Sequence, residues 1–444
     1  MNKLKVIRLF ATSEIVKQME ERSMSIKHYS ELIRAHITKD YKEMFRESGG
    51  AFMYPFLTPG SKQYADILWD WDSWLSNVAL KQILLELDDS VLTEDAAEYE
   101  KGCILNYLSW CSKEGWIPIA VQRTDHVGDL KPADIYSSNM HKPVLAQHAA
   151  LLVKQAGGDA EWLREGLYPL QRFVNNYRNH HRHSTGLYLW QNDHAIGVDN
   201  DPCTYFRPAR SSASIYLNCL MVKELEALSY LCGALSLNEA AADYDKDVWE
   251  LKAAIAEHCW DEKDGFFYNV DVLLLPKDNM NGLHSGQPRD WDCLIQRIGV
   301  WSGFMALWAG VATPEQAERV VAENYRDERT FHAAYGVRTL SKLEKMYNAR
   351  ASRNPSNWLG PIWGISNYLT FRGLVQYGFE QDARELAEKT ITLFGRDIER
   401  FGGMHEYYQP DNGEPILNKG FQNWNYLVLN MIAWLEGRPF IHEC

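Results

Sequence analysis

The links between the predicted helices alternate between short and long, and this alternation limits the folds open to the chain. Apolar residues at helical spacing predict twelve helices, over residues 25–47, 73–88, 93–112, 143–157, 158–180, 209–233, 236–260, 294–309, 314–323, 357–377, 380–400 and 421–435. Short links join the helices at 88–93, 157–158, 233–236, 309–314 and 377–380. The long loops that separate the pairs are 48–72, 113–142, 181–208, 261–293, 324–356 and 401–420. The helices are therefore predicted to form antiparallel pairs.

Six helical hairpins of this kind are expected to close into a ring. The predicted fold is all-α, an (α/α)6 barrel whose long loops gather at one mouth to form the active site. Length alone favours two domains, but no linker, low-complexity stretch or shift in composition marks a boundary. We therefore expect residues 1–444 to form a single domain. A two-domain helical protein and a helical solenoid are the alternatives, although no repeat at a fixed period supports the solenoid.

Local patterns support the helices and leave little room for strands. Within 236–260, one stripe at helical spacing is formed by Tyr244, Val248, Leu251 and Ile255. Thr313 and Gln316 have the spacing of a capping box, with Pro314 at the first helical position. The best alternating patterns, 186–190 and 265–275, predict short hairpin pieces inside long loops.

The stretch "WDWDSWLSN" at 69–77 packs three tryptophans and two aspartates ahead of an apolar helix. One interpretation is structural, with Asp72 as a helix cap and the indoles in the core. The other is a sugar pocket, in which indole faces stack on a pyranose and carboxylates bind its hydroxyls. Tryptophan, tyrosine, aspartate and asparagine recur through all six long loops, which favours the carbohydrate interpretation.

Two loops offer carboxylates for glycoside hydrolysis, which requires one carboxylic acid and one carboxylate. In "GVDNDP" the choices are Asp199 and Asp201, although the same residues are typical of a turn. In "GGMHEYYQPDNGEP" the best candidate is Glu406, which lies between a histidine and two tyrosines. The other acids of this stretch, Asp411 and Glu414, belong to or follow a plain turn.

Four separated stretches resemble, in order and approximate spacing, the motif series of glycoside hydrolase family 63 and the related trehalases. They are "WDWDSW", "GVDNDP", "NWLGPIWGISNYL" and "GGMHEYYQPDNGEP", and the resemblance spans roughly residues 50 to 435. It implies an (α/α)6 barrel and an inverting glycosidase acting mostly on α-glucosides. In size the chain is similar to bacterial hydrolases of mannosylglycerate or glucosylglycerate rather than to the larger eukaryotic members that trim N-glycans.

Carried over motif by motif, the resemblance implies that Asp199 is the general acid and Glu406 the general base. Inversion requires a water on the far side of the sugar, so the two carboxyl groups are expected to lie about 6.5–9.5 Å apart. The predicted substrate-binding residues are Trp71, Asp72, Gln122, Trp363, Tyr407 and Trp424. Trp69 and Trp74 are expected to anchor their loop to the barrel. A carboxylate-bearing aglycone would draw on Arg123, Lys142 or Arg207.

The predicted activity is hydrolysis of small α-glucosides, for example glucosylglycerate or a disaccharide. The alternatives are an α-mannoside such as mannosylglycerate, and trehalose. A more distant alternative is a sugar epimerase or isomerase, because enzymes of that class use paired histidines on the same barrel. The candidate histidines are His141, His148, His194, His284, His332 and His405.

Charge and cysteine content exclude several other classes of protein. The formal net charge of -13 argues against nucleic acid and anionic membranes as partners. The eight cysteines show no zinc-ligand spacing, so we expect no metal and no cofactor. No apolar run approaches the roughly 20 residues of a membrane span, and the N-terminus does not read as a signal peptide. We expect a cytoplasmic protein whose partner is a small carbohydrate.

Overall fold

The computed structural model describes residues 3–275, 291–350 and 356–443. Within these residues twelve α-helices account for most of the regular structure. They are α1 (Lys3–Asp40), α2 (Asp70–Leu87), α3 (Ser90–Ser109), α4 (Leu145–Gln155), α5 (Leu167–Asn176), α6 (Ile215–Ala234), α7 (Asn238–His258), α8 (Met305–Trp308), α9 (Pro314–Arg319), α10 (Gly364–Gln376), α11 (Glu380–Phe401) and α12 (Val428–Leu435). Each predicted helix has a counterpart among them, so the predicted order of elements is confirmed.

Several helix limits differ from the predictions. The first helix begins at Lys3 and ends at Asp40, whereas the sequence pattern placed it at 25–47. The predicted helix 294–309 was wrong over its first half, because residues 294–296 form a strand and only a 3-10 turn and the short α8 follow. Short apolar runs fit a buried helix and a strand equally well, which explains this error.

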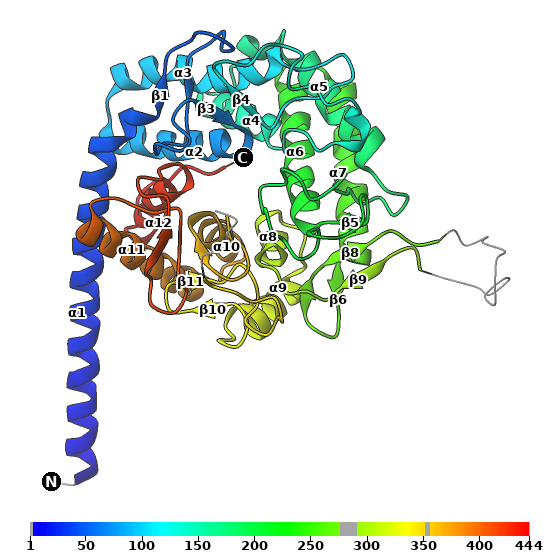
Figure 1. The fold of residues 1–444 in the computed structure, drawn as a ribbon. Coiled ribbons are helices and arrows are strands. Elements are labelled where there is room, and N and C mark those ends of the chain that lie inside the picture. Colours follow the sequence, from blue (N-terminus) through cyan, green and yellow to red (C-terminus); the bar gives the residue numbers. More distant parts are fainter. Residues whose placement is uncertain (1–2, 276–290, 351–355, 444) are drawn as a thin grey trace, which may run out of the picture.

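The even-numbered helices contact one another in a closed circuit. Helix α2 contacts α4, α4 contacts α6, α6 contacts α8, α8 contacts α10, α10 contacts α12, and α12 returns to α2. Figure 1 shows this circuit from one end, with α1, α3, α5 and α7 at its periphery. The alternation of short and long links therefore corresponds to an inner and an outer set of helices.

The described strands are short and lie in the loops. They are β1 (Phe45–Arg46), β2 (Phe56–Leu57), β3 (Ile67–Trp69), β4 (Ala120–Gln122), β5 (Ser212–Ala213), β6 (Trp260–Asp261), β7 (Phe266–Phe267), β8 (Asn269–Asp271), β9 (Leu294–Gln296), β10 (His332–Ala333), β11 (Gly336–Val337), β12 (Ile362–Trp363), β13 (Tyr407–Tyr408) and β14 (Pro415–Leu417). The strand prediction for 265–275 is confirmed by β7 and β8. The one for 186–190 is wrong, since Tyr188 makes only an isolated bridge to Arg182.

Two of these small sheets join loops that are distant in sequence. Strand β3 pairs antiparallel with β4, with Trp69 opposite Ala120, and so joins the first long loop to the second. Strand β12 pairs with β13, with Trp363 opposite Tyr407, and joins the segment directly before α10 to the sixth loop. Helices α2 and α10 begin directly after β3 and β12, so these sheets fix the loops at the N-terminal ends of two inner helices.

The hydrophobic core is continuous around the circuit and includes buried side chains from the inner helices and the loops, among them Trp74, Leu220 and Trp363. Trp74 packs against Trp308 at 6.1 Å, which confirms its predicted anchoring role. Cys219, Cys232 and Cys259 are buried free thiols. In the part of the chain that the structure describes, no helix is both long and apolar enough to cross a bilayer.

Candidate active site

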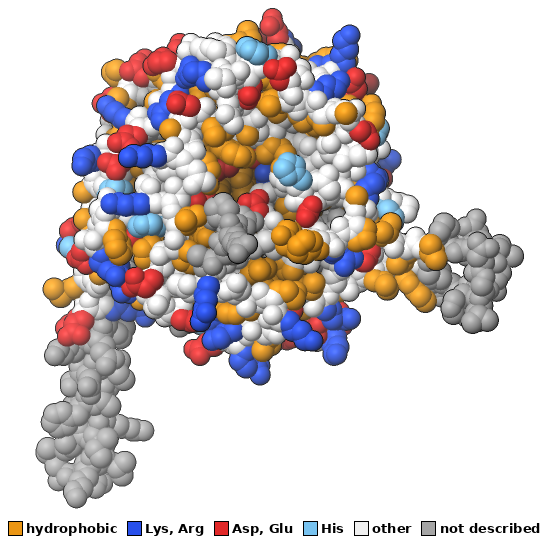
Figure 2. Space-filling model, in the orientation of Figure 1, with side chains coloured by type: hydrophobic (Ala, Val, Ile, Leu, Met, Phe, Trp, Pro, Cys, Tyr) orange, Lys and Arg blue, Asp and Glu red, His pale blue; other side chains and the backbone are white. Residues whose placement is uncertain are grey.

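A pocket of about 140 Å³ opens among the long loops at the N-terminal ends of α2 and α10. Figure 2 shows a hollow near the centre of this face, in which hydrophobic and acidic side chains gather. Tryptophans form much of its wall, namely Trp69, Trp71, Trp358, Trp363 and Trp424. Three carboxyl groups, from Asp72, Asp199 and Glu406, also line it. Indole faces together with carboxyl groups are suited to a sugar, whose ring has apolar C–H faces and hydroxyl edges.

The tryptophans are held rigidly by stacking. The rings of Trp358 and Trp363 lie parallel, with centroids 4.0 Å apart and an interplanar angle of 8°. Tyr407 stacks on the other side of Trp363 at 4.7 Å. Trp71 meets Trp424 edge to face at 5.3 Å. Because stacked rings cannot rotate independently, these walls have a fixed shape before any ligand enters.

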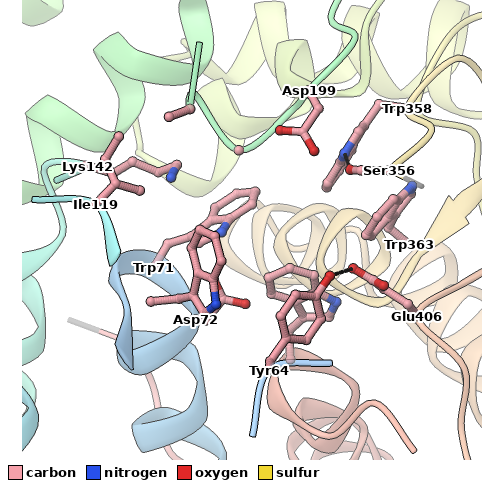
Figure 3. A pocket seen from close by; sticks show the side chains of 14 residues that line it. Tyr64, Trp71, Asp72, Ile119, Lys142, Asp199, Ser356, Trp358, Trp363 and Glu406 are labelled. Atoms are coloured by element: carbon pink, nitrogen blue, oxygen red, sulfur yellow. Dashed lines mark hydrogen bonds between the residues drawn. The ribbon is translucent and has the colours of Figure 1, made fainter. Parts of the chain in front are cut away.

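Asp199 enters the pocket from the loop between α5 and α6 (Figure 3). Burial raises the pKa of its carboxyl group, while a hydrogen bond from Ser356 and the charge of Lys142 oppose that rise. The loop is held by the next residue, Asn200, whose side-chain oxygen accepts a 2.7 Å hydrogen bond from the backbone N–H of Trp358. Upstream, Gly197 has a φ of +88°, a conformation that favours glycine.

Glu406 enters from the loop between α11 and α12 and is only 5% exposed. Each of its oxygens accepts a hydrogen bond, one from the Tyr64 hydroxyl at 3.1 Å and one from the Asn418 side chain at 3.0 Å. Burial raises the pKa of Glu406 to about 7, although both hydrogen bonds lower it. The charge of the nearby Asp199 contributes to this rise. The charge on Asp199 therefore affects the ionisation of Glu406.

Neighbouring groups hold the backbone around Glu406 in place. Its own N–H donates to the carbonyl of Leu417 at 3.0 Å. The preceding His405 contacts Asp397 through Nδ1 at 2.9 Å, and its carbonyl accepts a 2.7 Å bond from Asn425. His405 is thus a support for the glutamate in this arrangement and does not line the pocket.

Asp72 and Asp70 lie in the first turn of α2, where the helix dipole favours negative charge. Asp72 accepts a 2.5 Å hydrogen bond from Asn423, and burial raises the pKa of its carboxyl group well above the usual range. Asp70 does not line the pocket. It forms a buried ion pair with Lys142, whose Nζ lies 3.0 Å from both carboxylate oxygens.

The structure brings most of the predicted site residues together. Asp199 and Glu406 share one pocket with four of the predicted substrate-binding residues, Trp71, Asp72, Trp363 and Trp424. Tyr407 instead lies buried behind Trp363 and shapes the wall indirectly. Gln122 is at the exposed end of β4, two residues beyond Ala120, and does not line the pocket. Which residues of a short strand are buried is hard to infer from sequence, and this explains why Gln122 was wrongly predicted to line the site.

Other predicted candidates lie elsewhere. Asp201 caps its own turn by accepting from the N–H of Cys203 at 2.8 Å. Asp411 and Glu414 pair with Arg338 and Arg400. Arg123 donates to the carbonyls of residues 47 and 49, and Arg207 pairs with Asp271, so neither arginine lines the pocket.

The described histidines do not form a catalytic pair in the pocket. His141 and His148 are fully buried, and burial lowers their pKa values to about 4 and about 3. His194, His332 and His405 are also absent from the residues that line it. His284 lies outside the described residues. Within the described residues, no group of three or more histidine, cysteine, aspartate and glutamate side chains is arranged to hold a metal ion.

Sequence reasoning missed several lining residues. Trp69 was expected to anchor its loop but lines the pocket. Tyr64, Ser356 and Trp358 also line it, and Asn418 reaches Glu406 from outside the predicted motifs. Trp358 is part of the quoted "NWLGPIW" stretch and could have been singled out there. Tyr64 carries no local signal, because its role depends on a residue at the other end of the chain.

A family model described as "Mannosylglycerate hydrolase MGH1-like glycoside hydrolase domain" matches residues 68–442. The chain belongs to this family. The resemblance to glycoside hydrolase family 63 and the trehalases is thereby confirmed at the level of the family, which is one of glycoside hydrolases.

Individual relatives are more distant. Mannosylglycerate hydrolase MGH1 from Selaginella moellendorffii is 25% identical over 259 residues, which is 57% of this chain and 44% of that protein. The cytosolic neutral trehalase of Kluyveromyces lactis is 24% identical over 202 residues, 43% of this chain and 24% of that protein. The chain thus matches less than half the length of these relatives.

Solved structures show the shared fold. The GH63 mannosylglycerate hydrolase of Thermus thermophilus in complex with glucose superposes with a TM-score of 0.62 at 20% identity, covering 86% of this chain and 96% of that one. The neutral trehalase Nth1 of Saccharomyces cerevisiae gives 0.58 at 17% identity, covering 87% and 74%.

Proposed function

We propose that this glycoside hydrolase cleaves small α-glucosides with inversion of configuration. The observation that carries the proposal is the meeting of Asp199 and Glu406, from loops about 200 residues apart, in one tryptophan-lined pocket. Two carboxyl groups are the minimum equipment for acid–base cleavage of a glycosidic bond. We also propose that the closed circuit of inner helices is the inner ring of an (α/α)6 barrel, and that the chain forms one domain.

In the proposed reaction, Asp199 gives its proton to the oxygen of the leaving group. Glu406 removes a proton from a water that attacks the anomeric carbon from the opposite face, which inverts the configuration there. Asp72 accepts hydrogen bonds from sugar hydroxyls, while Trp71, Trp363 and Trp424 enclose the ring. Tyr407 supports Trp363, and we leave Gln122 out of the proposed site.

The assignment of acid and base rests on the family motifs. Burial raises the pKa of both carboxyl groups, so these shifts alone do not distinguish the two roles. The two hydrogen bonds that Glu406 accepts favour its ionised form, as a base requires. Ser356 and Lys142 restrain the rise at Asp199, which burial nevertheless keeps above the usual value, as an acid requires.

The family model and its relatives favour one alternative substrate class, an α-mannoside such as mannosylglycerate, and the trehalase relatives favour trehalose. The epimerase alternative has lost its support, since no described histidine lines the pocket. The cytoplasmic location stays a prediction.

Time-resolved proton NMR with a panel of α-glucosides and α-mannosides tests the proposal. The panel contains glucosylglycerate, mannosylglycerate, kojibiose, nigerose, isomaltose and trehalose. Early appearance of the β-anomer of the free sugar is expected. Early appearance of the α-anomer would refute inversion, and isomerisation of a free monosaccharide without cleavage of any glycoside would refute hydrolysis.

A further inference from the structure

Two buried asparagines join the loop of the proposed acid to the segment that carries Trp358. Asn200 directly follows Asp199, and its side-chain NH2 group donates to the side-chain oxygen of Asn357 at 3.1 Å. The side-chain oxygen of Asn200 accepts the backbone N–H of Trp358 at 2.7 Å. The two asparagines are 6% and 0% exposed. Because a buried amide group loses its partners when it turns, these bonds hold the acid loop at one place on the segment.

Asn357 is itself fixed by the backbone around it. Its side-chain NH2 group donates to the carbonyls of Asn348 and Arg350 at 2.8 and 2.7 Å. Its own backbone carbonyl accepts the indole N–H of Trp363 at 2.9 Å. The segment that holds Asn200 is therefore also bonded to the second tryptophan of the pocket wall.

A further connection runs from Trp358 to the carboxyl group of the acid. The indole N–H of Trp358 donates to the hydroxyl of Ser356 at 2.9 Å. The Ser356 side chain in turn forms a hydrogen bond with the carboxyl group of Asp199. Trp358 is thus linked to the acid twice, through Asn200 at the backbone and through Ser356 at the side chain.

Stacked rings continue this connection toward the base. Trp358 lies on Trp363 with ring centroids 4.0 Å apart, and Trp363 lies on Tyr407 at 4.7 Å, with interplanar angles of 8° and 14°. Tyr407 directly follows Glu406, and β12 pairs with β13 so that Trp363 is opposite Tyr407. Figure 3 shows the two tryptophans along the wall between Asp199 and Glu406. Close-packed parallel rings resist compression, so the distance between the outer rings is fixed.

We propose that the stacked rings of Trp358, Trp363 and Tyr407 form a spacer that sets the separation of the acid and the base. Asn200 is the positioning residue that attaches the acid to this spacer. This inference rests on the proposed function and extends it to residues that supply no reacting group. Two ring-to-ring steps are of the same scale as the separation in an inverting pair, about 6.5–9.5 Å, which leaves room for the attacking water.

Two substrates that differ in their need for an acid test the role of Asn200. A glycoside with a sugar or alkyl leaving group needs a proton on the departing oxygen. An α-glycosyl fluoride releases fluoride as a stable anion when water attacks the anomeric carbon. With the sugar that the wild type accepts, we expect Asn200→Ala to lower kcat at least 30-fold for the glycoside and less than 5-fold for the fluoride. Equal losses on both substrates, or no loss on either, would overturn the proposal.

Asn192→Ala is the matched control from the same loop. The side-chain oxygen of Asn192 accepts the backbone N–H of His194 at 2.9 Å and the side-chain NH2 group of Asn139 at 3.3 Å. Its removal should change the two rates by the same small factor. A selective loss on the glycoside in Asn192→Ala as large as in Asn200→Ala would show that the effect is not specific to the spacer.

The middle ring tests the spacer itself. Trp363→Phe keeps an aromatic ring between Trp358 and Tyr407, whereas Trp363→Leu keeps apolar bulk without a ring. We expect kcat for the glycoside to be at least 10-fold lower in Trp363→Leu than in Trp363→Phe. Equal values of kcat in the two folded variants would contradict the spacer. If Trp363→Leu does not fold, Asn200→Ala decides.

Crystal structures separate failure of this inference from failure of the proposed function. The distance between the carboxyl groups of Asp199 and Glu406 is measured without turnover, in the wild type and in Asn200→Ala. We expect it to change by about 1 Å or more, a displacement large enough to slow catalysis. An unchanged distance would overturn the spacer even if the wild type cleaves glycosides. A changed distance supports the spacer even if the wild type cleaves none.

Discussion

The hydroxyl of Tyr64 donates a 3.1 Å hydrogen bond to Glu406 across 342 residues of sequence. Tyr64 lies in the loop before α2 and Glu406 in the loop before α12, two inner helices that contact each other. Closure of the helical circuit thus completes the surroundings of the proposed base. Asn418 adds a second donor from the same loop as Glu406.

Replacing Tyr64 with phenylalanine should shift the pH dependence of the reaction. The hydroxyl stabilises the ionised form of Glu406, so its removal raises a pKa that is already about 7. The acid limb of kcat/KM should therefore move to higher pH, by about one unit for the loss of one charge-assisted hydrogen bond. Asn418→Ala should move it in the same direction. If the acid limb of kcat/KM stays at the same pH in both variants, the ionisation of Glu406 does not determine that limb.

The helices could be predicted because periodicity and link lengths are local properties. The capping box of Thr313 and Gln316, for example, occurs as the sequence indicated. The strand at 294–296 could not be distinguished from a helix, because its partner β8 is not adjacent to it in the sequence. Tertiary pairing decides such short apolar runs.

The site residues that belong to the recognised sequence motifs could be predicted. Asp199, Glu406, Trp71 and Asp72 were found in this way and share one pocket. The residues that tune them were not, because a hydrogen bond such as that of Tyr64 is a property of the folded chain. The ion pair of Asp70 and Lys142 likewise joins the start of α2 to a residue 72 positions further along the chain.

Removing either proposed catalytic carboxyl group should lower turnover strongly without unfolding the protein. We expect Asp199→Asn and Glu406→Gln to lower kcat by about 10²–10⁴-fold, the usual contribution of general acid–base catalysis. Asp201→Asn is the matched control, since Asp201 belongs to the same loop but only caps a turn. It should reduce thermal stability and leave kcat within a few-fold of wild type. Full activity in either catalytic variant would remove that residue from its proposed role.

Ionisation of the proposed base, Glu406, should lower the stability of the folded protein at neutral pH. Burial raises the pKa of Glu406 from 4.5 to about 7, so the folded protein binds this proton more tightly than the unfolded chain. The resulting stability is complete below pH 4.5 and is lost as the pH rises to about 7.

Glu406→Gln has no such proton to lose. Its free energy of unfolding should exceed that of wild type by up to about 3 kcal/mol at pH 8 and should match it at pH 4. Urea denaturation at the two pH values measures the difference. An equal advantage at both would show that ionisation of Glu406 is not its cause.

Gly197 should tolerate no side chain, because the neighbouring Lys142 is held in place by its ion pair with Asp70. A Cβ at this position would lie 2.6 Å from Cε of Lys142 and 2.9 Å from Trp71, and Asp70 prevents the lysine from moving away. Gly197→Ala should therefore displace the Asp199 loop and lower kcat/KM at least 10-fold. Gly158 has a similar φ of +96° with open space around it, so Gly158→Ala carries only the backbone cost of about 1 kcal/mol and should keep full activity. If the two variants lost activity equally, backbone strain and not the contact with Lys142 would account for the loss.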